Sequence, residues 1–185
     1  MPRTITIKNG RGSVELGWQE VSIKKATYGV WGEGENASNF IDIWFNELPE
    51  TLNMRVYEAK DSEGNEFAIG TVFRFANAGI TTVLDGPAGE KSVTIDDNPN
   101  NLKDRKLNVY LYPDPKNPKY SRVLKQPAPT AFKNEVETFT DQDVEYHKSR
   151  AETYYNKWVK KDNEAPEVVV SNQDTNGVTA DDLPF

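Results

Sequence analysis

Two alternating stretches, FIDIWF at residues 40–45 and LNMRVYEAK at residues 52–60, decide the fold that this sequence predicts. Apolar and other side chains alternate in both with a period of two, which is the pattern of β-strands with one buried face. In the first stretch, Ile41 and Ile43 fall on one face and Trp44 falls on the other. Each stretch therefore offers an aliphatic face for a core and an opposite face that carries aromatic, polar or charged side chains.

Further runs share this texture and are separated by turn sequences. The additional predicted strands are Thr4–Lys8, Val21–Lys25, Phe67–Phe75, Ser92–Ile95 and Leu107–Tyr112. The turn at Asp61–Asn65 separates two long runs and predicts a hairpin. No ten-residue helical pattern interrupts the strands, which argues against a parallel α/β fold. Short strands at this spacing predict a small antiparallel barrel or a sandwich.

An extended connector and one helix are predicted after this β-rich part. The sequence Gln126-Pro127-Ala128-Pro129 favours extended backbone, because a residue that precedes proline avoids the helical region. Residues 141–161 are predicted to form the helix, with Thr140 or Asp141 as its N-cap, acidic side chains in the first turn and lysines in the last. The apolar stripe of this helix consists of Val144, Ala151, Tyr155 and Trp158.

The end of the chain differs sharply in charge from the rest. All 22 Lys and Arg and 23 of the 29 acidic residues lie in residues 1–161, which leaves that part with a net charge of -1. Residues 162–185 hold the other six acidic residues and no basic residue. Such a segment buries too little apolar surface to offset its ordering entropy, so we predict a disordered acidic tail. The overall acidity therefore does not exclude nucleic acid as a ligand of the body.

Several classes of chemistry lack the residues that they require. With no cysteine and a single histidine, His147, the chain has no disulfide, thiolate zinc site or Cys–His pair. We expect no enzymatic activity, no catalytic residue, no metal site and no cofactor. No apolar run approaches the roughly 20 residues of a membrane span, and residues 1–10, MPRTITIKNG, lack the apolar core that a secretory signal requires. We therefore expect a cytoplasmic protein without a membrane partner.

The last five residues, Asp181-Asp182-Leu183-Pro184-Phe185, have the chemistry of a compact peptide ligand. The Phe185 ring suits an apolar pocket, its carboxylate suits a neighbouring cation, and Pro184 reduces the entropy lost on docking. This tip resembles the acidic terminus of bacterial single-stranded DNA-binding proteins, which typically ends in several Asp, an aliphatic residue, Pro and Phe. Phage-encoded proteins of this class often have similar tails.

The resemblance implies a DNA-binding OB-fold whose tail recruits replication and repair proteins and competes with DNA for the basic groove. Residues 1–125 have only the general character of an OB-type barrel. We thus predict a mainly β protein, with an OB-like antiparallel β-barrel and elaborated hairpins over 1–125, a connector and C-terminal α-helix over 126–161, and a disordered acidic tail over 162–185. The amphipathic helix departs from the bacterial pattern and favours a phage-encoded protein that acts in DNA replication, recombination and repair in a bacterial host.

Binding of single strands requires aromatic rings that stack on bases and basic groups that contact phosphates. The predicted nucleic-acid-binding residues are Trp44, Arg55, Tyr57, Arg74, Arg105, Lys106, Tyr110 and Tyr112. A structural interpretation competes with this one, because helix 141–161 must bury Tyr155 and Trp158 and an aromatic sheet face is a natural place for them. Trp18 and Trp31 lie beside glycines and suit either a loop contact or a core role.

Three functions remain open from the sequence. The first is a single-stranded DNA-binding protein whose helix packs on the barrel or mediates self-association. The second is an interaction protein that mimics the tail to engage host replication factors and binds no DNA, which predicts that the sheet aromatics are buried. The third is a β-sandwich virion or carbohydrate-binding component, in which the terminal sequence is a coincidence.

Overall fold

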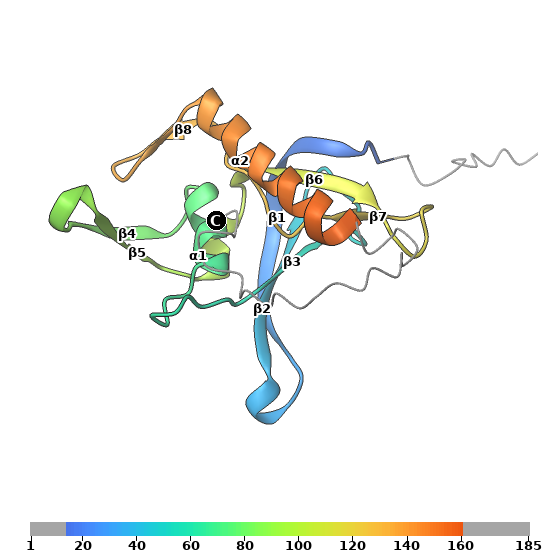
Figure 1. Ribbon diagram of the computed structural model, residues 1–185, viewed down its shortest axis with the longest axis horizontal. Helices are drawn as coiled ribbons and strands as arrows, with labels where there is room; N and C mark the ends of the chain where they lie inside the picture. Colours follow the sequence, from blue (N-terminus) through green and yellow to red (C-terminus); the bar gives the residue numbers. More distant parts are fainter. Residues whose placement is uncertain (1–13, 161–185) are drawn as a thin grey trace, which may run out of the picture.

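The computed structural model describes residues 14–160, which form one five-stranded sheet, two two-stranded sheets and two α-helices (Figure 1). In chain order the elements are β1 (Gly17–Trp31), the 3-10 turn η1 (Gly34–Asn36), β2 (Ser38–Phe45), β3 (Met54–Tyr57), α1 (Ala68–Phe75), β4 (Ile80–Asp85), η2 (Pro87–Gly89), β5 (Lys91–Ile95), η3 (Pro99–Leu102), β6 (Lys106–Pro113), β7 (Ser121–Val123), β8 (Phe132–Lys133), β9 (Thr138–Phe139), α2 (Asp141–Tyr154) and the π-helical turn η4 (Tyr155–Val159). The predicted strand Thr4–Lys8 and the tail at 162–185 lie outside the described residues.

The five-stranded sheet has the order β3-β2-β1-β6-β7, and all of its neighbouring strands are antiparallel. The long strand β1 lies at its centre, where residues 17–22 pair with β6 and residues 25–31 pair with β2. A register shift between Ile23 and Lys25 inserts one extra residue between these halves. Such a bulge bends the strand and resets its alternation, so that Ile23 before it and Ala26 after it both face the core.

The core fills the inner face of this sheet, and α1 covers that face. Buried aliphatic side chains from β1, β2, β3 and β6 form one cluster with the apolar side chains of α1. Because a helix rather than a second sheet packs on the inner face, a sandwich does not describe residues 14–160. The β1–β2 and β4–β5 hairpins project from this body in different directions (Figure 1).

The prediction of a strand at Phe67–Phe75 is wrong, because this segment forms α1. The prediction followed Phe67, Ile69, Phe73 and Phe75, which share the phase of a strand. Six of the eight α1 residues are buried, and the other two, Gly70 and Arg74, lie four positions apart, on one side of the helix. The Glu66 carboxylate accepts hydrogen bonds from the backbone N–H groups of Ile69 (2.8 Å) and Gly70 (2.9 Å), which stabilises the helix start. The predicted turn at Asp61–Asn65 is present, but it leads from β3 into this helix.

The expectation of a mainly β, antiparallel protein with one C-terminal helix is confirmed. The expected closure into a barrel is not seen: β3 and β7 are the two edges of the sheet, and within residues 14–160 no ladder joins them. The predicted strands at residues 40–45, 52–60, 92–95 and 107–112 correspond to β2, β3, β5 and β6, and residues 21–25 lie within β1. The strands β4, β7, β8 and β9 were not predicted.

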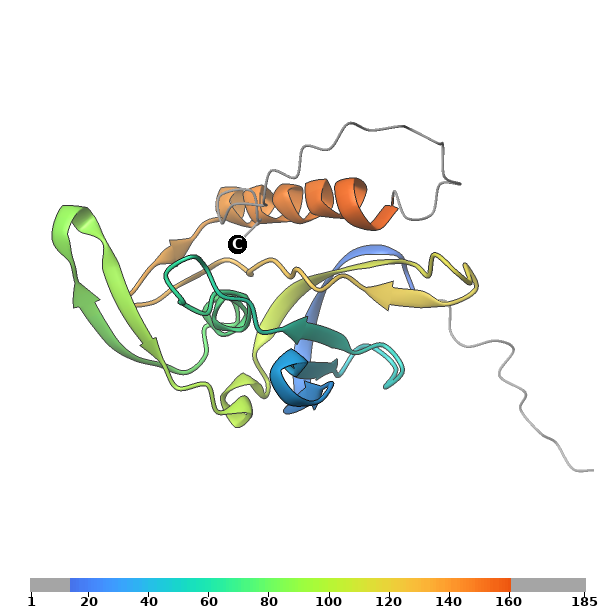
Figure 2. The same ribbon diagram turned by 60° about the horizontal axis from the view of Figure 1, so that its bottom comes forward.

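The connector and α2 form a layer on the outer face of the sheet, on the side of the molecule opposite the tip of the β1–β2 hairpin (Figure 2). The connector is extended, as predicted, and Asn108 of β6 and Ala128 exchange two backbone hydrogen bonds of 2.9 Å. Thr140 caps α2, because its hydroxyl accepts from the Asp143 N–H while the Asp143 carboxylate accepts from the Thr140 N–H. The predicted helix at 141–161 is confirmed from Asp141 to Val159, because η4 continues α2.

Candidate nucleic-acid interface

The outer face of the five-stranded sheet is divided into a covered half and an open half. The covered half lies over β6 and the first part of β1, beneath α2. The open half lies over β2, β3 and the second part of β1. Cross-strand pairing places six side chains together on this open half, which we call the open face: Lys25, Phe40, Asp42, Trp44, Arg55 and Tyr57. The structure thus brings together three of the predicted binding residues, Trp44, Arg55 and Tyr57.

An ion pair lies at the centre of the open face. Arg55 Nε and Nη2 donate to the two carboxylate oxygens of Asp42 at 2.8 and 2.7 Å, and the Asn53 amide donates to the same carboxylate at 3.0 Å. The Arg55 guanidinium also lies over the Phe40 ring, with 3.8 Å between its carbon and the ring centroid. Hydrogen bonding to Asp42 raises the pKa of Arg55 above its usual value, so this residue is a permanent cation.

A second cation contacts an aromatic ring at the other end of the open face. Lys25 pairs with Trp44 across β1 and β2, and its Nζ lies 4.7 Å from the centroid of the indole. The same Nζ lies 3.9 Å from the Glu50 carboxylate, which also pairs with Lys24 at 3.0 Å. Each cation of this region therefore has an acidic neighbour, and the excess positive charge of the open face is small.

The open face leaves aromatic rings accessible. Tyr57 is 37% exposed and packs edge-on against Phe40, with 5.6 Å between the ring centroids. Trp31 ends β1 on the same face and is 66% exposed. Rings held by cross-strand partners and open on one side can accept a stacked base.

Tyr110 and Tyr112 of β6 point to the covered half of the same sheet face. The ring of Tyr155 lies 5.3 Å from that of Tyr110 and 5.1 Å from that of Tyr112, measured between centroids. Trp18 packs on Tyr110 and donates a 2.7 Å hydrogen bond from Nε1 to Glu152 of α2. Burial raises the pKa of both Tyr110 and Tyr112. The structural interpretation is supported for Tyr155, which packs from η4 against both tyrosines and is half-buried there. The expected burial of Trp158 is wrong, because its side chain is 45% exposed.

The remaining predicted residues lie away from the open face. Arg74 is on α1 and pairs with Glu137 at 2.6 Å, so it is not part of a sheet face. Lys106 begins β6 and pairs with Glu20 at 3.4 Å. Arg105 lies in the preceding turn, where its backbone oxygen accepts from Ile23 N–H at 2.8 Å, beside the β1 bulge. Lys106 and Arg105 therefore lie near the β1 bulge, and neither belongs to the open face.

Three residues of the open face or beside it were not among the predicted binding residues: Phe40 and Lys25, which belong to it, and Trp31, which lies at its edge. The strand alternation indicates Phe40, since it has the same phase as Trp44. Strand alternation did not indicate Lys25, because the bulge in β1 changes the phase of the strand and no local sequence pattern predicts that bulge.

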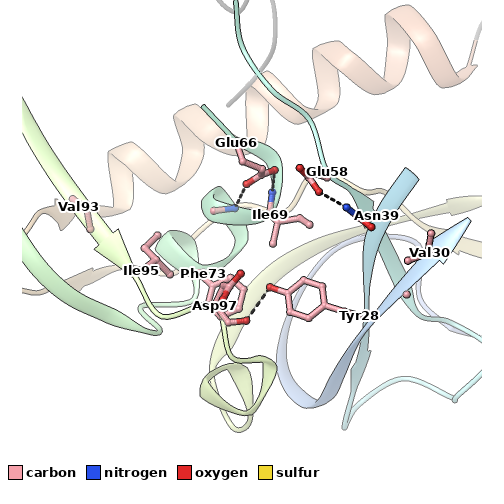
Figure 3. Close-up of a pocket in the computed structure, with 12 residues that line it drawn as sticks. Tyr28, Val30, Asn39, Glu58, Glu66, Ile69, Phe73, Val93, Ile95 and Asp97 are labelled. Atoms are coloured by element: carbon pink, nitrogen blue, oxygen red, sulfur yellow. Dashed lines mark hydrogen bonds between the residues drawn. The ribbon is translucent and has the colours of Figure 1, made fainter. Parts of the chain in front are cut away.

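A cleft of about 670 Å³ lies on the inner side of β1, between β1, α1 and β5 (Figure 3). Tyr28 crosses it and donates a 2.9 Å hydrogen bond to the Asp97 backbone oxygen. Burial and the charges of Asp97 and Glu66 raise the pKa of Tyr28. Glu58 adds a third carboxylate to the lining, and the cleft contains no Lys or Arg. Its negative potential repels phosphates, so it is a poor nucleic-acid site compared with the open face.

Residues 14–160 contain no group of three or more His, Asp or Glu side chains placed to hold a metal ion. Over the same residues, no helix is long and apolar enough to cross a membrane. Comparison with protein-family models, curated proteins and solved structures finds no match for this chain.

Proposed function

We propose that this chain is a non-enzymatic single-stranded DNA-binding protein that binds DNA on its open face. The observation that carries the proposal is the grouping of Trp44, Arg55 and Tyr57 on one uncovered sheet face, although they come from two strands. Stacking of bases on such side chains contributes about 1–3 kcal/mol per base and requires no particular sequence. A surface of this kind suits a protein that coats single strands.

The strand connectivity supports the same function. Strands β1, β2 and β3 form a meander, α1 follows, and β6 and β7 return to the other side of β1. We interpret this arrangement as an opened relative of the OB-fold, a partly open five-stranded barrel that binds oligonucleotides on the face of its second and third strands. The open face lies over β2 and β3, the corresponding strands in this chain.

The charge of the molecule sets the expected binding mode. The body carries a net charge near zero, and the cations of the open face have acidic partners. Few counterions are then released when DNA binds, so affinity should fall only gently as the salt concentration rises. Stacking, together with a few contacts from Lys24, Arg105 and Lys106 near the β1 bulge, supplies most of the binding free energy in this proposal.

The test is the binding of fluorescently labelled oligo-dT to the full chain, followed by fluorescence anisotropy. Trp44→Ala and Tyr57→Ala should each weaken binding about tenfold, in line with the loss of one stacked base. Tyr146→Ala is the matched control, because Tyr146 is a 57% exposed aromatic residue on α2. Duplex DNA should compete poorly. No binding by the wild-type chain at low salt would overturn the proposal and favour an interaction protein that binds no DNA.

The tip Asp181–Phe185 lies outside the described residues, and its proposed role is to recruit replication and repair proteins and to compete with DNA. A chain that ends at Gly177 should therefore bind oligo-dT more tightly than the full chain, most clearly at low salt. Equal affinities of the two chains would contradict competition by the tail while leaving DNA binding itself intact.

A further inference from the structure

The Arg55 guanidinium is held in one plane by groups on the open face. Its Nε and Nη2 atoms are bonded to Asp42, a residue only 7% exposed, and the Asn53 amide fixes the same carboxylate from another side. One face of the guanidinium lies 3.8 Å from the centroid of the Phe40 ring. The Arg55 side chain is nevertheless 39% exposed, so part of it remains open to solvent.

The layer beneath the guanidinium is fixed as well. Phe40 is buried although it lies on the outer face, because its ring packs onto the backbone of Gly29 in β1. A Cβ atom at residue 29 would lie 2.7 Å from Phe40 Cε2 and closer still to Cζ, which no side chain can tolerate without moving the ring. Gly29, Phe40 and Arg55 therefore form successive layers, with Arg55 outermost.

The charge of this arrangement argues against a phosphate contact. A phosphate approaching Arg55 meets the Asp42 carboxylate, which already occupies two of the guanidinium donors and offsets its charge. A base approaching the open surface of the guanidinium meets a flat, weakly hydrated group already stacked on a ring. Arginine planes stack on aromatic systems in this way, and bases stack on them in nucleic-acid complexes.

Resting on the proposed function, we propose that Arg55 is a base-stacking residue rather than a phosphate contact, and that Gly29, Phe40 and Asp42 are positioning residues for it. The ligand recognised here is an unpaired nucleobase, stacked on the guanidinium in continuation of the Phe40 layer.

The decisive variant is Arg55→Lys, which keeps the positive charge and the Asp42 partner but removes the planar group. Binding is measured with labelled oligo-dT and with an abasic oligonucleotide of the same length, which has the same phosphates and no bases. Arg55→Lys should weaken oligo-dT binding about five- to twentyfold, leave abasic binding unchanged, and leave the slope of log affinity against log salt unchanged. The matched control is Arg122→Lys, since Arg122 pairs with Asp114 at 2.6 Å on β7, away from the open face. It should alter neither ligand's affinity.

A second variant tests the positioning layer. Gly29→Ala displaces the Phe40 ring and with it the guanidinium, and should reproduce the loss of oligo-dT affinity while circular dichroism shows a folded chain. Wild-type oligo-dT affinity in Arg55→Lys, or an equal loss on the abasic ligand, would overturn the inference while the proposed function stands. An Arg55→Met variant whose salt slope falls by about 0.7, as expected when one phosphate contact to a single strand is lost, would overturn it as well. Failure of the wild-type chain to bind oligo-dT would instead refute the proposed function.

Discussion

Arg74 of α1 and Glu137, which immediately precedes β9, form a bidentate ion pair. Arg74 Nε lies 2.7 Å from Oε1 of Glu137, and Nη2 lies 2.6 Å from Oε2. The pair joins the helix that covers the inner face of the sheet to the β8–β9 hairpin, across 63 residues of sequence. The Arg74 guanidinium also lies 5.5 Å from the centroid of Phe139. Its position indicates a role in stability.

We expect Arg74→Gln to destabilise the protein without weakening DNA binding. The Arg74 side chain is 43% exposed, so solvent screening reduces the value of the pair, and a loss of about 1–2 kcal/mol in the free energy of unfolding is expected. Urea unfolding measures this loss, and oligo-dT anisotropy measures the affinity of the folded protein. If Arg74→Gln clearly weakened oligo-dT binding and left the free energy of unfolding unchanged, Arg74 would instead be a DNA contact.

The pH dependence of stability should report on His147. This side chain packs against Phe75 and Phe139, and burial lowers its pKa, with Arg74 and Arg150 acting in the same direction and Asp143 and Glu137 opposing them. Between the lowered native pKa and the unfolded value of about 6.5, the unfolded chain binds more protons. Stability is therefore complete above about pH 6.5 and decreases as the pH falls below it.

Urea unfolding of the wild-type chain and of His147→Phe between pH 5.5 and pH 7.5 checks this prediction. Phenylalanine preserves the aromatic packing and removes the titration, so the variant should show a flatter profile in this range. Identical slopes for the two proteins would assign the pH dependence to other groups.

The start of α2 should depend on its capping box. Thr140→Ala removes the hydroxyl that accepts from the Asp143 N–H and should cost about 1 kcal/mol in the free energy of unfolding. Thr153 offers a matched control, because its hydroxyl only donates to the Ser149 backbone oxygen within the helix. Thr153→Ala should be nearly neutral or slightly stabilising. Equal effects of the two substitutions would show that the cap contributes little.

Tyr110 should contribute to stability and not to DNA binding. Its ring contacts Trp18 and Tyr155, and aromatic pairs of this kind are each worth about 0.5–1.5 kcal/mol beyond the area that they bury. Tyr110→Leu should therefore lower the free energy of unfolding by at least about 1 kcal/mol and leave oligo-dT affinity as it is. Reduced affinity in a protein of unchanged stability would mean that α2 moves aside when DNA binds.

Local sequence was sufficient to predict most of the strands and α2. Alternation indicated β2, β3 and β6, each of which has one face on the core, and also β5, none of whose residues is fully buried. The Thr140 cap with its following acidic turn indicated where α2 begins. Local sequence failed at α1, because this helix has only eight residues and several of its apolar side chains also have the phase of a strand. The segment is rich in residues with β-propensity, but its apolar side chains pack against the inner face of the sheet as a helix.

For the candidate site, the sequence by itself determined which side chains of β2, β3 and β6 point away from the aliphatic core, because alternation along a regular strand is a local property. Trp44, Tyr57, Tyr110 and Tyr112 are equivalent by that criterion. Only the tertiary structure distinguished them: Tyr155 of η4 packs against the two tyrosines of β6, whereas Trp44 and Tyr57 lie on the open face. The bulge in β1 likewise placed Lys25 beside Trp44. Contacts between segments that are distant in the chain depend on how helices and strands pack. Packing depends on the side chains of several elements together, so no single stretch of sequence determines it.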